Sequence, residues 1–267
     1  MSRPVRDTSV EIVGRVDMAL FGSKKAKVEV DEVDEAAELD EVAEDDPEAD
    51  DDADDEWDDE ADDDLDDDAP EPDEWVQLDL SRDWRDDGPF DISEVDLEAD
   101  DVQRIDLGAL IVTPERGFTI QVAADAQTQI ATQVVVSNAP QSAMQLTLFA
   151  APSDEDFRAD IRQDMIDQSS QARSVELVEG PFGTEIRRVL PVTDASGREG
   201  TVPMRDWLVA GPRWVLNARL MGAAALGNKG KTLAVGLEEF FRNIVVRRDD
   251  TAMVPGTAVP LTLPTKP

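Results

Sequence analysis

The sequence contains no cysteine, no histidine and no tyrosine. Without cysteine the chain has no disulfide framework, no thiolate nucleophile and no cysteine-ligated zinc site. Without histidine it lacks the usual general base near neutral pH, and the Ser-His-Asp and Cys-His catalytic arrangements are excluded. We therefore expect a protein that is not an enzyme and that carries no cofactor and no metal.

Long apolar runs are missing as well. No stretch reaches the ~18 consecutive apolar residues that a membrane-spanning helix needs. Arg3, Arg6 and Arg15 are not followed by an apolar run of signal-peptide length. With the lack of cysteine, these absences favour a cytoplasmic protein with no membrane partner.

The charge is concentrated in one segment. The chain has a net charge of −37, and 30 aspartates and glutamates lie between Val28 and Trp75, where there is no lysine or arginine. By contrast, the stretch from Val102 to Asp250 holds 19 acidic and 16 basic residues. The acidic segment contains too few apolar residues to offset the chain entropy of folding. We predict a disordered acidic segment over residues 1–74, in front of a nearly neutral folded body.

Three further segments follow from the composition. Residues 75–101 place tryptophans and aliphatic side chains among acids, which is typical of a segment that docks on a folded surface, either its own or a partner's. Residues 102–250 have a globular pattern, and residues 251–267 are proline-rich and are expected to be an extended tail. Met18 begins a stretch that resembles a natural protein start. Translation therefore begins either at Met18, without residues 1–17, or at Met1, with residues 1–17 as an ordinary disordered leader.

The globular segment alternates between polar and apolar residues, which predicts half-buried antiparallel strands. Expected strands are 104–110, 117–123, 128–137, 143–150, 175–178, 184–191, 199–209, 213–221 and 244–247. Helices are expected from Ser153, as N-cap with Asp156 as its capping partner, to about Gln171, and from Lys231 to Asn243. Because strands dominate and their connections are short, the predicted class is α+β, a mostly antiparallel sheet with two packed helices.

Five arginines fall on or beside predicted strands and could form a patch for an anion or a protein partner: Arg187, Arg188, Arg213, Arg219 and Arg247. The competing interpretation is scattered surface charge that is paired with Glu185, Glu238 and Glu239. Surface ion pairs are common and weak, which favours the second interpretation. The folded body lacks a basic excess, so we expect it not to bind nucleic acid.

Residues Ala225–Thr232 fit a loose phosphate-binding loop with alanine in place of the first glycine. Only 35 residues follow Thr232, and no later strand ending in aspartate completes a magnesium site. A flexible glycine and lysine loop before a helix is the favoured interpretation. The acidic segment contains no glycine for a calcium loop, so we expect only nonspecific cation association there.

Several stretches in the same order resemble the actinobacterial "domain of unknown function 3710" family, and the resemblance extends from about Gly88 to Pro264. They are Gly88–Glu94, Arg104–Leu110, Leu146–Pro152, Glu179–Glu185, Gly211–Trp214 and Phe241–Arg247. The family has no established activity that transfers to particular residues. The order of elements is also similar to the Mog1/PsbP-like fold, which is a topological analogy only.

These observations predict an uncharacterised interaction protein. A folded module would bind a protein partner, and the acidic arm would steer a basic partner towards it. The alternative is a domain that binds a small molecule or an anion, or an enzyme that uses arginines and carboxylates. A third arrangement has the acidic arm docked on the arginine-bearing strands of its own domain.

Overall fold

A computed structural model describes residues 10–12, 73–124, 128, 130–139, 142–153, 156–193 and 197–263. These residues belong to one structural unit, which comprises residues 1–20 and 72–267. The prediction of disorder for residues 1–74 falls almost entirely outside the described residues. Within that range the structure describes strand β1 (Val10–Ile12), the cap residue Asp73 and the first residue of helix α1.

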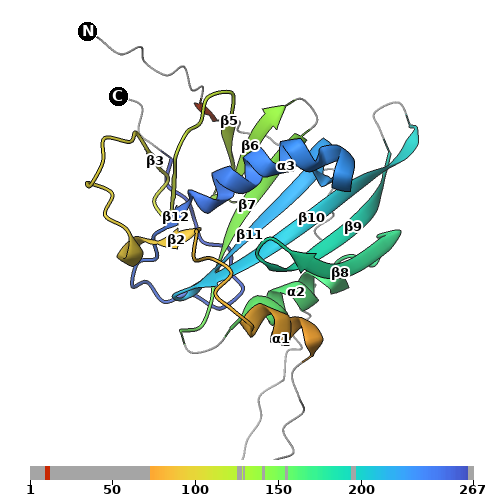
Figure 1. Ribbon diagram of the computed structural model, residues 1–267, viewed down its shortest axis with the longest axis horizontal. Coiled ribbons are helices and arrows are strands. Elements are labelled where there is room, and N and C mark those ends of the chain that lie inside the picture. The colour runs from red at the N-terminus through yellow and green to blue at the C-terminus, as the bar shows by residue number, and fades with distance from the viewer. Residues whose placement is uncertain are drawn as a thin grey trace, which may run out of the picture. The chain divides into compact units, whose positions relative to one another are not determined.

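The main element is a sheet of eight strands in the order β1-β5-β6-β7-β11-β10-β9-β8 (Figure 1). Besides β1, its strands are β5 (Thr119–Ala124), β6 (Ala131–Ala139), β7 (Ser142–Ala150), β8 (Ser174–Gly180), β9 (Gly183–Thr193), β10 (Glu199–Gly211) and β11 (Trp214–Gly222). All neighbours are antiparallel except β1, which runs parallel to β5. The mostly antiparallel sheet predicted from the alternation is confirmed.

A second, smaller sheet has the order β2-β12-β4-β3. Its strands are β2 (Phe90–Asp91), β3 (Ile105–Asp106), β4 (Leu110–Val112) and β12 (Val245–Val246). The predicted strand 104–110 is therefore two short strands, because the chain turns between them at Gly108, which has a φ of 78°.

Helices lie on both faces of the large sheet: α3 (Gly227–Arg242) in front and α2 (Arg158–Asp167) behind, in the view of Figure 1. The faces separate on β10, where Trp207 belongs to the core under α3 and its neighbour Leu208 belongs to the smaller cluster under α2. Successive strand residues point to opposite faces. The described residues also include helix α1 (Glu74–Leu80) and two 3-10 turns, Ile92–Glu94 and Ala223–Ala225. This architecture is the predicted α+β class.

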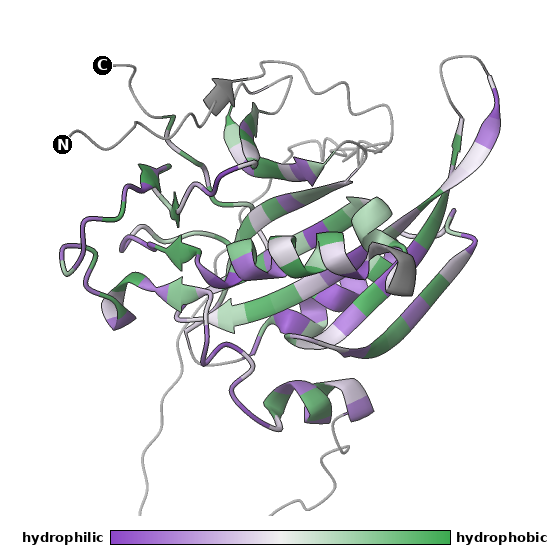
Figure 2. Cartoon of the chain, turned by 45° about the horizontal axis from the view of Figure 1, so that its top comes forward, coloured by the Kyte–Doolittle hydropathy of each residue, from purple (hydrophilic) through white to green (hydrophobic). Residues whose placement is uncertain are grey.

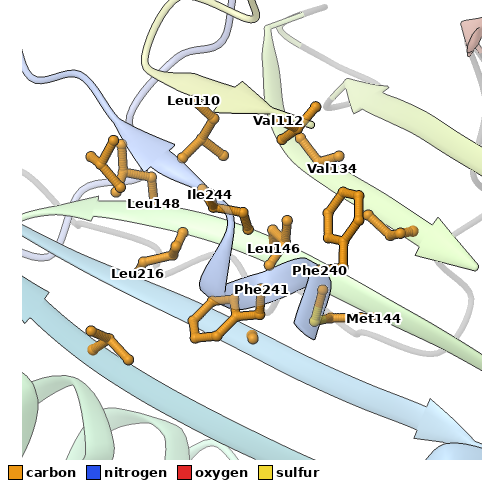
Figure 3. Close-up of a cluster of buried hydrophobic side chains, with 14 of the residues drawn as sticks. Leu110, Val112, Val134, Met144, Leu146, Leu148, Leu216, Phe240, Phe241 and Ile244 are labelled. Carbon is orange, nitrogen blue, oxygen red and sulfur yellow. The ribbon is translucent and has the colours of Figure 1, made fainter. Parts of the chain in front are cut away.

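The main core lies between α3 and the sheet. Phe240 and Phe241, at the C-terminal end of α3, lie close to Leu146 and Leu216 of the sheet (Figure 3). Figure 2 shows hydrophobic and hydrophilic residues alternating along the long strands, which is the pattern that predicted them. Burial of such side chains contributes on the order of 1.5–3 kcal/mol each.

Two helix boundaries differ from those predicted. Helix α2 begins at Arg158 with Phe157 as its N-cap, so the predicted Ser153 cap is wrong. The partner expected for that cap, Asp156, instead accepts hydrogen bonds from the backbone and guanidinium of Arg158. Helix α3 begins at Gly227, four residues earlier than expected, because local propensity arguments discount glycine in a helix.

A bulge between β5 and β6 corrects one predicted sheet face. Uninterrupted alternation along the predicted strand 128–137 would place Ile130, Thr132, Val134 and Val136 on the same face. In the structure Ala123 pairs with Gln133 and Ala124 pairs with Ala131, so Thr132 has no partner in the register. Such an extra residue reverses the alternation beyond it. Ala131 is consequently buried, whereas Ile130 is 45% exposed.

The C-terminal segment is extended, as predicted, and it is also packed on the domain. The amide of Val259 donates to the carbonyl of Leu148, and the amide of Leu261 donates to the carbonyl of Ala131. Ala258 forms a bridge with Phe149, beyond the end of the β6–β7 ladder. Val259 and Leu261 are buried in the main core. The segment therefore completes the sheet where β6 stops.

Candidate functional site at strands β9 and β10

The five predicted arginines do not share one surface. Arg187 and Arg188 are consecutive on β9, so their side chains lie on opposite faces of the sheet. Arg219 lies on β11, Arg213 in the turn between β10 and β11, and Arg247 directly after β12. The five cations therefore do not form the single patch considered as one possibility, because the strand geometry distributes them over both faces and a distant turn.

Two of these arginines are engaged far from the others. The guanidinium of Arg213 donates to the backbone carbonyl of Asp249 and lies 3.9 Å from the carboxylate of Asp250. Arg247 Nη1 lies 2.8 Å from the carboxylate of Asp106. Such partly exposed pairs contribute little to stability.

On the face of the sheet that α3 covers, Glu185 is the centre of a polar cluster with Arg187, Arg205 and Trp207. The side chain is fully buried. Its carboxylate accepts hydrogen bonds from Arg187 Nε at 2.7 Å, Arg205 Nη2 at 2.6 Å and Trp207 Nε1 at 2.6 Å. Burial alone would raise the pKa of Glu185, but the bonds from Arg205, Arg187 and Trp207 outweigh it, and the pKa lies below the ordinary value. Glu185 is therefore held ionised.

A second buried carboxylate, that of Asp206, lies on the α2 face of the same two strands. Arg188 Nη2 donates to its Oδ2 at 2.5 Å, and Arg219 Nε donates to its Oδ1 at 2.7 Å. Arg188 continues to the hydroxyl of Ser169, just after α2, at 2.9 Å. Each carboxylate oxygen thus faces a guanidinium, and Arg188 connects the strand to the helix side of this face.

The two carboxylates are related by the strand register. Trp207 pairs with Glu185 across β10 and β9, and Asp206 is the residue before Trp207. The same pair of strands therefore carries one arginine-bound carboxylate on each face. Arg205 and Asp206 were missed at the sequence level. The sequence feature that could have identified them is their position as a charged pair inside an otherwise apolar stretch of β10. Strand alternation alone does not show that such a pair is buried.

This arrangement bears on chemistry. A carboxylate that accepts two charged donors and an indole N–H, with a lowered pKa, is not tuned for proton transfer near neutral pH. Within the described ranges, no group of three or more acidic side chains is placed to hold a metal ion. The geometry of the cluster is that of an ion-pair network that ties β9, β10 and β11 together.

The predicted docking segment, residues 75–101, meets the domain through a third buried carboxylate. Asp79 of α1 accepts a hydrogen bond from Arg162 Nη1 of α2 at 2.5 Å and another from the amide of Thr184 at 2.7 Å. Arg158 Nη2 donates to the backbone carbonyl of Asp79 at 3.0 Å. One aspartate therefore joins α1 to both α2 and the start of β9.

Trp84 and Asp91, further along the same segment, are also buried. Trp84 is buried, its Nε1 donates to the carbonyl of Leu78 at 3.0 Å, and Arg82 stacks on its ring. Asp91 accepts a hydrogen bond from Trp214 Nε1 at 2.8 Å. The segment is thus docked on its own domain.

The stretch that resembles a phosphate-binding loop has a different geometry. From Gly227 onward it is already helical, so it forms no loop ahead of the helix. A Cβ on Gly230 would lie 2.0 Å from the carbonyl oxygen of Ala223. The glycine at that position permits close packing of α3 against the preceding 3-10 turn, which explains its presence without a phosphate.

The chain belongs to the DUF3710 family of proteins of unknown function, whose family model matches residues 88–267. The resemblance seen in the sequence is confirmed. The matched range includes Glu185, Asp206, Arg162 and Gly183 and excludes α1. No curated protein matches the chain.

Three solved structures are similar to parts of the chain, all with low identity. A protein of Bacteroides thetaiotaomicron VPI-5482 has 12% identity and a TM-score of 0.32, over 54% of this chain and 47% of its own, so the chain spans about half its length. Cyanobacterial PsbP from Synechocystis sp. PCC 6803 has 10% identity and a TM-score of 0.32, over 54% of this chain and 91% of its own. LpqN of Mycobacterium tuberculosis, described as involved in cell envelope biogenesis, has 12% identity and a TM-score of 0.28, over 60% and 99%.

Likenesses at these TM-scores carry no argument about function. Among the residues that the structure describes, no helix is both long and apolar enough to cross a membrane.

Proposed function

We propose that this protein is a non-enzymatic interaction module whose folded domain binds a protein partner, while the acidic segment speeds the encounter with basic partners. The observation that supports the proposal is the division of charge. Thirty acidic residues without a single cation lie between Val28 and Trp75, next to a domain whose charges nearly balance. Such a field raises association rates at low salt and fades at high salt.

The point at which the acidic segment joins the domain adds support. Asp73, near its end, caps α1 by accepting hydrogen bonds from the amides of Trp75 and Val76. Asp79 anchors the same helix to α2 and β9. The chain that follows the acidic segment is therefore anchored to the domain from its first described residues.

The alternative function, an anion-binding domain or an enzyme that uses arginines and carboxylates, has less support. The arginines of the cluster are already engaged by Glu185 and Asp206. An incoming anion would have to compete with buried carboxylates for these arginines.

The lack of cysteine and of a spanning helix among the described residues favours a cytoplasmic place of action within this proposal.

The proposal is tested with full-length chains that differ only in the charge of residues 29–71. In one variant every aspartate and glutamate of that range is replaced by asparagine or glutamine, which keeps the length. Partners are captured from the native cell with both chains and purified. Their association rates are then measured at about 50 mM and about 500 mM salt.

We expect the same partner to bind both chains, with an association rate at low salt at least about tenfold higher for the native chain and nearly equal rates at high salt. Crosslinks should place the partner on residues 73–263. A partner that binds only the acidic segment, or rates that respond equally to salt in both chains, would contradict the proposal.

A further inference from the structure

Asp79 occupies a small polar receptor on the surface of the domain. The receptor consists of the Arg162 guanidinium, the Thr184 amide and Gly183, which is the first residue of β9. A Cβ on Gly183 would lie 2.6 Å from Asp79 Oδ1, so a side chain at this position would displace the carboxylate, and the φ of 92° at Gly183 also favours glycine. Arg162 is itself 4% exposed. A guanidinium and a backbone amide that converge on one carboxylate are the donors that bind such a group most strongly.

Helix α1 is held in this receptor mainly by polar contacts. It has seven residues, of which only Asp79 is buried. Leu80 is 60% exposed, and the other apolar residues of the helix are only partly buried. A helix of this length is not stable alone in water. Besides the carboxylate of Asp79, two backbone carbonyls of the helix are bound: Arg158 donates to that of Asp79, and the Thr184 hydroxyl donates to that of Trp75. The carboxylate is the one buried charge among these contacts, so its loss should weaken the attachment of the helix.

We propose that this receptor, defined by Arg162, Thr184 and Gly183, is a binding site for an aspartate in a short acidic segment of a partner protein, and that Asp79 occupies it in cis. The receptor belongs to the part of the chain matched by the family model, whereas α1 lies outside that part. The donor geometry that recognises Asp79 is independent of which chain supplies the carboxylate. When α1 detaches, the same donors become available to another acidic helix.

The receptor also specifies the ligand. A basic or neutral segment would leave Arg162 buried without a counter-charge, which is strongly unfavourable. Arg158 donates to the main-chain carbonyl of the residue that fills the receptor, at 3.0 Å. That second contact selects a carboxylate on a helical or turned backbone over a free small acid. This inference holds whether or not the acidic segment steers partners.

The test supplies α1 in trans. The probe is a fluorescein-labelled peptide of residues 73–86 of this chain, added to the full-length chain carrying Asp79→Ala and to the native chain. We expect the Asp79→Ala chain to bind the peptide at least about tenfold more tightly than the native chain, whose receptor is occupied. Adding Arg162→Met to the same chain should abolish the gain. Circular dichroism establishes that each chain is folded.

Two peptide variants make the test specific. The Asp79→Asn peptide should lose about tenfold or more in affinity, because it no longer forms the charge-assisted bond to Arg162. The Glu74→Gln peptide, altered at an exposed acid of the same helix, should bind like the original. Equal binding by the Asp79→Asn peptide, or no gain from Asp79→Ala in a folded chain, would overturn the proposal.

If the Asp79→Ala chain does not fold, Asp79→Asn serves instead, since it retains the size of the side chain. Hydrogen exchange of residues 78–81 in the native chain gives an independent measure. Excess peptide should accelerate their exchange by competing for the receptor, and unchanged exchange at saturating peptide would count against the site. Because these measurements need no native partner, failure here differs from failure of the proposed function.

Discussion

Trp207 donates its indole N–H to the carboxylate of Glu185 over 2.6 Å, with both side chains buried on the sheet face that α3 covers. The indole ring also packs against Phe182 and Phe241, at centroid distances of 5.2 and 5.9 Å. The polar cluster and the apolar core thus meet at one side chain. Glu185 consequently fixes Trp207, and through it the contact between β10 and the end of α3.

Replacement of Glu185 by glutamine should destabilise the domain strongly. Arg205 would lose its ionised partner in a site where it is only 14% exposed. Removing one partner of a buried pair costs about 3–5 kcal/mol. Urea unfolding followed by tryptophan fluorescence measures the change. Glu179→Gln on the exposed edge strand β8 is the matched control, and similar losses for the two variants would refute the central position of Glu185.

The stability of the domain should fall in acid, and Glu185 should account for part of the fall. The pKa of Glu185 is lowered, as are those of Asp91 and Asp156, in each case because hydrogen bonds outweigh the effect of burial. A carboxylate with a lowered folded-state pKa contributes stability that is complete above its unfolded pKa and is lost as the pH falls through the folded pKa. The loss should therefore begin near pH 4.5, the ordinary value for glutamate.

One group acts in the opposite direction: burial and the nearby Glu239 raise the pKa of Glu115. The contribution of Glu115 to stability therefore decreases as the pH rises through the range in which Glu115 ionises.

The difference in unfolding free energy between the native chain and the Glu185→Gln chain, measured from pH 7 downward, isolates the contribution of Glu185 from that of the acidic segment. This difference should shrink below about pH 4.5. A constant difference would show that the pKa of Glu185 is the same in the folded and unfolded states.

Adjacent arginines on β9 should respond very differently to the same substitution. Arg188→Met removes a buried guanidinium from Asp206 and Ser169, so it should cost about 3 kcal/mol or more. Arg187→Met removes a side chain that is 46% exposed, and it should cost less than about 1 kcal/mol. Urea denaturation gives both values. A larger loss for Arg187 would show that the network is held from the α3 face.

Features of the fold that depend on neighbouring residues could be predicted from the sequence, whereas features that depend on contacts between distant parts of the chain could not. Alternation along the strands is local, so the antiparallel hairpins and the helix that contains Leu237 and Phe240 were found. The start of α2 was misplaced because Asp156 binds Arg158 and does not complete a cap at Ser153. The bulge at Thr132 depends on the pairing of two strands, which no pattern within one strand reveals.

The candidate site was less accessible to sequence reasoning. Arg187, Arg188 and Arg219 were identified as strand arginines, but their partners depend on register. Glu185 was expected as a surface counter-charge, and it is fully buried. The role of Asp79 depends on Arg162 and Thr184, which are more than 80 residues away in the chain. No local pattern encodes such a contact.

The final prediction concerns the C-terminal segment, where two leucines two residues apart provide an internal comparison. Leu261 is 8% exposed and donates its amide to Ala131, whereas Leu263 is 40% exposed. Leu261→Ala should lower the free energy of unfolding by about 2–5 kcal/mol, as buried leucines do. Leu263→Ala should change it by less than about 1 kcal/mol. Thermal and urea unfolding of the two full-length variants measure the contrast. Equal effects would mean that the segment does not complete the sheet beside β7, since only a packed strand gives alternate residues unequal weight.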